Sequence, residues 1–405
     1  MAILRPFRAL RPRPADAPRV AAVPYDVVTT DEARTLAEGN PLSFLRVSRS
    51  EIELPPGTDT YSDEVYARAA RNFQALRQST LVLDEEPSVY LYRLGMGGHV
   101  QMGVAGCVSL DEYDRDIIRK HERTRPDKED DRTRHMIALG AQTGPVFLTY
   151  RADDDVDLIA ERASAGEPVA NFTAVDGVEH TVWRVAGGDR DALVGAFGRI
   201  PALYIADGHH RAASAARAWK QSKERPASDA ADPSTMLAVA FPDDQVQILP
   251  YNRIVKDLGG ATPAEFLAAV RERFDVDSGG ATPSRRGEIA MDLAGTWYRL
   301  RPRAPADRAD AIGSLDVAVL QDQLLAPILH IGDVRTDKRI DFVGGGRGIA
   351  ELERLVDSGK AAVAFSLYPV SVADLMAVSD AGGIMPPKST WFEPKLRDGL
   401  LIHLI

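Results

Sequence analysis

Leu203-Tyr204-Ile205-Ala206-Asp207-Gly208-His209-His210-Arg211 is the stretch of sequence that decides the fold around it. Its apolar residues predict a short buried strand, and the alanine-rich run that follows predicts a helix from about His209 to Lys220. Asp207 stands where the helix N-cap is expected, and Gly208 permits a tight turn. The stretch therefore predicts a strand, a turn and a helix in direct succession.

The first turn of this predicted helix carries unusual charge. His209, His210 and Arg211 place potential cations at the end of the helix whose dipole already favours anions. Helix N-termini bind phosphate, Gly208 allows close backbone approach, and Arg211 can pair with two phosphoryl oxygens. Asp207 could hold a magnesium ion that bridges those oxygens. Two other interpretations stay open: a capped helix with solvent-exposed histidines, and a zinc site, for which no HExxH spacing is present.

Composition limits the class of protein. Of the residues, 44% are hydrophobic and 27% are charged, which is typical of a globular protein. The length of 405 residues favours two or three structural units. A net charge of −10 disfavours a general nucleic-acid binder but permits a local anion site. A single cysteine, Cys107, and the lack of a long apolar run predict a cytoplasmic protein without a membrane segment.

Three pairs of apolar runs flank glycine turns and predict β-hairpins, at Gly97-Gly98, at Asp176-Gly177 and at Ala294-Gly295. Several antiparallel pairs argue against a purely parallel sheet. We therefore expect an α+β (mixed α/β) fold, with mixed, partly antiparallel sheets and flanking helices. One helix is predicted to be capped by Thr30 and to run to about Glu38, and another is predicted from about Ser62 to Gln78.

A boundary is predicted in the segment from Gly259 to Pro263, whose glycines and proline interrupt regular structure. It divides the chain into a catalytic region with an N-terminal α/β portion, residues 1–260, and a C-terminal α+β region, residues 261–405. The glycine run from Gly344 to Gly348 does not match the GxxxxGK[ST] pattern, which excludes a P-loop kinase. We interpret it as a turn before a helix.

A second group of charged residues spans Arg119 to His135. Most of it is expected to form a solvated loop and a helix start. Within it, Glu122 is a candidate general base because it stands among basic groups, and His121 is a further catalytic candidate. Smaller candidates for binding a ligand lie in three turns elsewhere in the chain: Tyr25, Asp26, Asn252, Arg253, Lys388, Ser389 and Thr390.

The motif from Ala206 to Ala212 resembles the signature of the ParB/sulfiredoxin-like free serine kinases. The wider order of motifs resembles a large bacterial family that looks like full-length homologues of pyrophosphate- or nucleotide-dependent serine kinases. The motifs that carry this resemblance are Val23-Pro-Tyr-Asp-Val, Lys120-His-Glu-Arg-Thr, Asp207-Gly-His-His-Arg, Leu249-Pro-Tyr-Asn-Arg and Pro387-Lys-Ser-Thr. It covers nearly the whole chain.

The resemblance implies a ParB/sulfiredoxin-like core and transfer of a phosphoryl group from ATP, ADP or pyrophosphate to free L-serine, giving O-phosphoserine. It implies that the turn from Asp207 to Arg211 binds the donor phosphate and Mg²⁺, with Glu122 as the base. His209 stands where sulfiredoxins have a cysteine, so thiol chemistry is not expected. Two other functions stay open, a ParB-related nucleotide-binding regulator and a metal-dependent phosphohydrolase.

Overall fold

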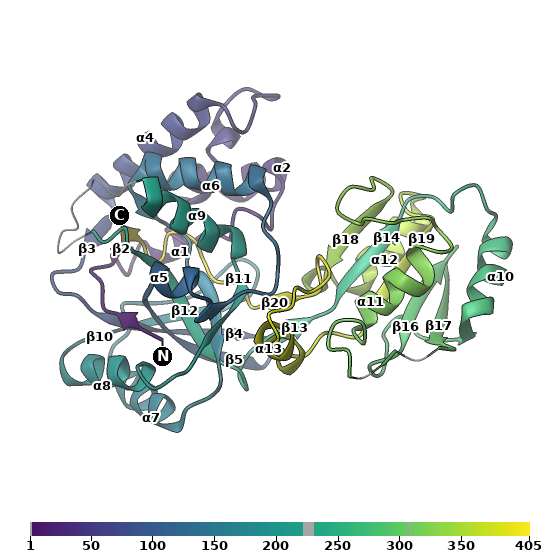
Figure 1. Ribbon diagram of the computed structural model, residues 1–405. Coiled ribbons are helices and arrows are strands. Elements are labelled where there is room, and N and C mark those ends of the chain that lie inside the picture. Colours follow the sequence, from purple (N-terminus) through teal and green to yellow (C-terminus); the bar gives the residue numbers. More distant parts are fainter. Residues whose placement is uncertain (1, 222–230, 305, 308) are drawn as a thin grey trace. The chain divides into compact units, whose positions relative to one another are not determined.

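The computed structural model describes residues 2–221, 231–304, 306–307 and 309–405 (Figure 1). Contacts between residues divide the chain into two compact units. The first unit comprises Met1–Lys120, Thr124–Val246 and Pro394–Ile405, and the second comprises His121–Arg123 and Gln247–Glu393. The division into domains near residue 260 stays a prediction, whereas the mixed α/β class is confirmed.

A large mixed sheet forms the centre of the first unit. Its strands follow the order β6 (Ile118–Arg119), β11 (Leu203–Asp207), β8 (Val146–Tyr150), β12 (Thr235–Pro242), β5 (His99–Ser109), β4 (Val89–Met96), β10 (Glu179–Val185) and β9 (Ala170–Thr173), and β1 (Leu4–Arg5) also pairs with β5. The pairs β6–β11 and β8–β12 are parallel, and the remaining pairs of this sheet are antiparallel.

The predicted hairpins are confirmed by the strand pairing. Gly97 and Gly98, both with positive φ, connect β4 to β5, and Gly177 lies between β9 and β10. In the second unit, Ala294 (φ 54°) and Gly295 (φ 77°) connect β16 (Ile289–Leu293) to β17 (Thr296–Pro302). Two successive residues with positive φ form the turn that best matches the twist of paired strands.

One face of the large sheet packs against helices. Alternate residues of its strands, such as Leu148 of β8 and Ala238 of β12, form a continuous apolar core. The same core contains residues of α5 (Leu110–Asp114), α7 (Asp154–Ala163), α8 (Gly187–Phe197) and α9 (His209–Gln221). Small residues of α9, including Ala212 and Ala215, are buried there, which allows this helix to lie close to the sheet.

A second apolar core in the first unit joins both ends of the chain. It includes residues from α1 (Ala17–Val20), α2 (Thr30–Ala37), α3 (Leu45–Ser48), α4 (Asp63–Ser79) and α6 (Pro126–Leu139), together with Ile402. Leu10, in β2 (Leu10–Pro12), bridges to Ile402, so the yellow C-terminal end lies beside β2 (Figure 1). Two short pairs complete this region, β2 with β3 (Leu81–Leu83) and β21 (His403–Leu404) with β7 (Ala141–Gln142).

The predicted helices form with small shifts of their ends. The predicted cap at Thr30 was wrong by one residue, because the side chain of Thr29 accepts a hydrogen bond from the Glu32 backbone N–H while the Glu32 side chain accepts one from the Thr29 backbone N–H. The helix expected from Ser62 is α4, which begins at Asp63. The short 3₁₀ segment η1 (Ser50–Glu53) follows α3.

The second unit is built on an antiparallel sheet. Its order is β15 (Phe274–Ser278), β17, β16, β19 (Val363–Leu367), β14 (Tyr251–Val255) and β18 (Ile340–Gly344), and a separate pair is formed by β13 (Gln247–Leu249) and β20 (Trp391–Glu393). Its helical segments are α10 (Pro263–Arg273), α11 (Asp316–Leu320), the π-helical η2 (Gln321–Leu325), the 3₁₀ η3 (Gly345–Arg347), α12 (Gly348–Asp357) and α13 (Val372–Asp380).

The glycine run before α12 was predicted to be a turn, but Gly344 ends β18, the 3₁₀ helix η3 spans Gly345–Arg347 and Gly348 begins α12. A Cβ atom at Gly344 would lie 2.5 Å from the Trp391 ring, and one at Gly345 would lie 2.6 Å from Leu249. Close packing against these neighbours therefore accounts for Gly344 and Gly345, whereas Gly348 has a positive φ of 70°.

Candidate functional site

The turn from Asp207 to Arg211 joins β11 directly to α9, as the sequence predicts. Gly208 has φ +95°, and its carbonyl accepts the hydrogen bond from Ala212 N–H, 3.0 Å away. Gly208, not Asp207, therefore occupies the N-cap position, and the predicted N-cap was wrong by one residue. The reason is that Asp207 still pairs with Phe147 of β8 and so belongs to the strand.

The carboxylate of Asp207 lies between two cations. Its Oδ2 atom is 3.3 Å from Nζ of Lys395 and 3.4 Å from Nη2 of Arg211, and its Oδ1 accepts the Gly208 N–H at 3.0 Å. Burial alone would raise the pKa of Asp207, but the positive charges of Lys395 and Arg211 hold it below its usual value. Asp207 is therefore ionised and serves as their shared counter-charge.

Arg211 is held inside the protein, with 5% of its surface exposed. Its Nη1 donates to the carbonyl of Pro145 and its Nη2 donates to Asp207. A Cβ atom at position 208 would lie 3.0 Å from Nε and 3.1 Å from Cζ of Arg211, so the guanidinium occupies the space that the glycine leaves. Arg211 is thus a fixed part of the turn, and its direct contact with a phosphate stays a prediction.

The two histidines differ in environment. His209 is buried and His210 is partly buried, so the alternative of two solvent-exposed histidines is wrong. The backbone N–H of Arg125 donates to Nε2 of His210 at 3.1 Å. An N–H donor requires this nitrogen to carry no proton, which places the proton of a neutral imidazole on Nδ1. Because Arg125 is the N-cap residue of α6, this bond ties the start of α6 to the start of α9.

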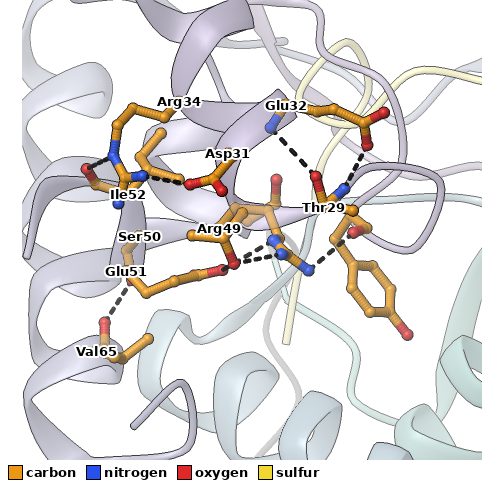
Figure 2. A network of polar contacts seen from close by, with 12 residues as sticks. Thr29, Asp31, Glu32, Arg34, Arg49, Ser50, Glu51, Ile52 and Val65 are labelled. Carbon is orange, nitrogen blue, oxygen red and sulfur yellow. Dashed lines mark hydrogen bonds and ion pairs between the residues drawn. The ribbon is translucent and has the colours of Figure 1, made fainter. Parts of the chain in front are cut away.

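Tyr25 and Asp26 also lie in the first unit. Tyr25 is buried, and the guanidinium carbon of Arg132 stands 4.1 Å from the centre of its ring. Arg49 holds this turn, because its Nη1 donates to the Tyr25 carbonyl at 3.2 Å. Figure 2 shows Arg49 beside Glu51, whose Oε1 lies 2.8 Å from Nε of Arg49. Tyr25 and Arg211 line the same small cavity, so the structure brings the predicted Tyr25 turn to the Asp207 turn.

Two residues near this turn were not predicted from the sequence to belong to the site. Arg132 comes from the middle of α6, and Asp398 comes from the C-terminal segment, which pairs with Ala22 through two backbone hydrogen bonds. Both line the cavity beside Arg211. Neither belongs to a readable motif, because the fold rather than sequence spacing brings them to α9.

The other predicted site residues belong to the second unit. Arg253 is 2% exposed, and its guanidinium donates to the carbonyls of Tyr251, Pro387 and Lys388. Burial lowers the pKa of Arg253 to about 10. No carboxylate pairs with it among the residues that the structure describes, which is unusual for a buried cation. Arg253 therefore fixes the turn that carries Lys388, whose φ is +59°.

The remaining residues predicted to bind a ligand or to act in catalysis also make contacts within the second unit. Nε2 of His121 is 3.4 Å from the hydroxyl of Thr390, and the Met385 N–H donates to the His121 carbonyl. The hydroxyl of Ser389 donates to the Pro386 carbonyl, and Oδ1 of Asn252 accepts the Leu367 N–H. His121 and the turn from Lys388 to Thr390 are thus neighbours, while Asn252 serves the sheet. Glu122 adjoins His121 in sequence, and its role as a base stays a prediction.

A magnesium ion does not fit the Asp207 carboxylate as this structure arranges it. Magnesium is usually held by one or two carboxylates together with waters and phosphates. One oxygen of Asp207 already accepts an N–H, and the other faces the cations Lys395 and Arg211. A divalent cation there would meet two like charges. The metal-binding role of Asp207 and the binding of an anion at this turn stay predictions.

Within the described ranges, no helix has the combination of length and apolar character needed to span a lipid bilayer.

The chain matches one protein family and is distantly similar to several solved structures. No curated protein matches the chain. Solved structures with similar folds include SbnI with a C-terminal truncation from Staphylococcus aureus (13% identity, TM-score 0.38, covering 74% of this chain and 87% of that one) and a free serine kinase in complex with AMP (14%, 0.38, 74% and 92%). A conserved hypothetical protein from Pyrococcus furiosus is similar at 14% identity and a TM-score of 0.37, over 74% and 95% of the two chains.

A family model described as "Protein of unknown function (DUF1015)" matches residues 4–318, which is more than half of the chain. The chain therefore belongs to the DUF1015 family of proteins of unknown function.

Proposed function

We propose that this protein is a small-molecule kinase that transfers a phosphoryl group from ATP, ADP or pyrophosphate to the hydroxyl of free L-serine. The observation that supports it is the turn at Gly208, where the start of a 13-residue helix adjoins Lys395 and Arg211. Two fixed cations face one carboxylate there, so the helix start has an excess of positive charge. Such a turn suits the oxygens of a phosphoryl donor.

The proposed roles follow from these contacts. The backbone N–H groups at the start of α9 bind the transferred phosphoryl group, and Gly208 makes room for the Arg211 guanidinium beside them. Lys395 exchanges its contact with Asp207 for one with a phosphate oxygen, while Arg211 keeps Asp207 in place. Phosphoryl transfer needs mainly positioning and neutralisation of charge, which these groups supply.

In the proposed reaction the serine hydroxyl oxygen bonds to the terminal phosphorus as the bond to the bridging oxygen breaks. The products are O-phosphoserine and ADP, AMP or phosphate, according to the donor. The hydroxyl proton passes to a base, for which Glu122 is the candidate. The choice of serine as acceptor and of Glu122 as base comes from the resemblance of the motifs.

The test is an assay of purified protein with magnesium, L-serine and each donor in turn, with mass spectrometry of O-phosphoserine. Lys395→Met should reduce the product formed at least about tenfold, since it removes a charge-assisted contact worth about 1.5–3 kcal/mol. Lys220→Met is the matched control, because Lys220 lies on α9 but pairs at the surface with Asp114. Absence of product with every donor, from folded protein, would overturn the proposal.

The same assay separates the other functions. Nucleotide binding by calorimetry without turnover would indicate a ligand-binding regulator. Release of phosphate at a comparable rate without any acceptor would indicate a phosphohydrolase.

A further inference from the structure

A small polar cavity lies inside the first unit, directly beside Arg211. Tyr25, Ser48, Arg132, Arg211 and Asp398 are among the residues that line it. Its volume is about 20 Å³, which is enough for one water molecule. The lining residues come from the Tyr25 turn, from α3, α6 and α9, and from the C-terminal segment, so the cavity lies where several parts of the first unit meet.

Three buried polar atoms on this wall have no hydrogen-bonding partner in the protein: Oγ of Ser48, Nε of Arg211 and Oδ1 of Asp398. Each of the three residues exposes 5% or less of its surface. An unpaired buried donor or acceptor costs about 1–3 kcal/mol, so three of them around one cavity form an arrangement that needs a ligand. The three atoms supply one N–H donor, one hydroxyl and one carboxylate acceptor.

The space beside Asp398 depends on a glycine. A Cβ atom on Gly144 would overlap with the Oδ1 atom of Asp398. With glycine at this position, the carboxylate can approach the chain while its Oδ1 remains without a protein partner.

We propose that this cavity binds one water molecule that links Nε of Arg211 to Oδ1 of Asp398 and Oγ of Ser48, and that Asp398 is thereby a positioning residue for Arg211. The water accepts the Nε–H of Arg211 and donates to the carboxylate, with the hydroxyl of Ser48 as its third partner. Arg211 is then held at both ends, by Asp207 and Pro145 at its terminal nitrogens and by the water at Nε.

The surroundings of Asp398 place the gain and loss of its proton near neutral pH. Burial raises the pKa of Asp398 to about 7, with a further rise from Asp26, although Arg211 and Arg132 act against it. His135, on the same cavity wall, stays neutral there, because burial lowers its pKa to about 4. The Tyr25 hydroxyl is neutral as well, since burial raises its pKa. Loss of the Asp398 proton therefore adds one negative charge beside Arg211.

Two measurements test the water site without any phosphate ligand. A crystal structure at atomic resolution should show one ordered water within hydrogen-bonding distance of the three atoms, and Ser48→Ala should weaken its density. Infrared difference spectra should show a protonated carboxyl that titrates near pH 7 and disappears in Asp398→Asn. Asp316→Asn is the control, because it removes a different buried carboxyl whose pKa is raised to about 6.

A third measurement rests on the proposed function, because it uses pyrophosphate as a probe of the turn. Its affinity, followed by phosphorus NMR, should fall about fivefold or more in the wild type as the pH rises through 7, and should stay level in Asp398→Asn. An empty cavity in the crystal, or no carboxyl titrating near pH 7, would overturn the inference. Pyrophosphate that binds to neither protein, with the water and titration present, would instead count against pyrophosphate as the donor in the proposed function and leave the water site in place.

Discussion

Replacing Gly208 by alanine should destabilise the Asp207 turn through its backbone and through Arg211. The φ of +95° costs an L-residue about 1–3 kcal/mol. The new Cβ would also lie 3.0–3.2 Å from three atoms of the Arg211 guanidinium, which must move away from Asp207 and Pro145. Loss of these charge-assisted bonds adds about 1–3 kcal/mol, so the expected total is about 2–6 kcal/mol.

Urea denaturation of Gly208→Ala measures this loss, and Gly57→Ala is the matched control. Gly57 has a similar φ of +87°, but a Cβ there would meet nothing within 4 Å. The control should therefore lose only the backbone contribution, about 1–3 kcal/mol. Equal losses in the two variants would refute the argument that Arg211 occupies the space beside Gly208.

Three further predictions concern buried charges. Asp207→Asn should lower the free energy of unfolding by about 1–3 kcal/mol at neutral pH, because the lowered pKa of Asp207 makes its ionised form stabilising. Denaturation curves should show that the difference from the wild type shrinks as the pH falls below about 4. A difference that stays constant with pH would contradict this. Arg397→Leu should lower the free energy of unfolding by about 2–4 kcal/mol, because Arg397 donates to His180 at 3.0 Å and to Asp176 at 2.7 Å. Thermal denaturation measures this loss, and a loss below about 1 kcal/mol would count against the prediction. Arg253→Ala should speed trypsin cleavage after Lys388, because the carbonyls of Pro387 and Lys388 lose the hydrogen bonds that the Arg253 guanidinium donates to them. An unchanged cleavage rate would show that this turn keeps its structure without Arg253.

Local patterns accounted for much of the fold. The hairpins at Gly98, Gly177 and Gly295 follow from glycine between two apolar runs, a signal that depends only on neighbouring residues. The strand, turn and helix around Gly208 follow in the same way. The order of strands in the large sheet could not be read from the sequence, because pairing such as β12 with β5 joins residues more than a hundred positions apart.

The candidate site was predicted as separate local motifs, and the sequence did not show that the Tyr25 turn lies beside Arg211. The turn from Asp207 to Arg211 was found, but the misassigned N-cap shows the limit of local rules: pairing with β8 kept Asp207 in the strand. The contacts of Arg211 with Pro145 and Asp207 could not be read from the sequence, and its predicted contact with a ligand stays a prediction. Asp398 carries no signal at all, since an aspartate before a glycine usually marks an ordinary turn.

The segment Pro394–Ile405 has a consequence for the order in which the protein can mature. It belongs to the first unit, although 147 residues of the second unit, Gln247–Glu393, are translated before it. During synthesis the sheet carrying Asp207 therefore emerges from the ribosome long before Lys395, which pairs with that carboxylate, and Asp398, which lines the cavity. Until then Asp207 lacks one of its two cations, so a nascent chain stalled before residue 394 can contain the turn but cannot yet have the pair of cations at the proposed anion site.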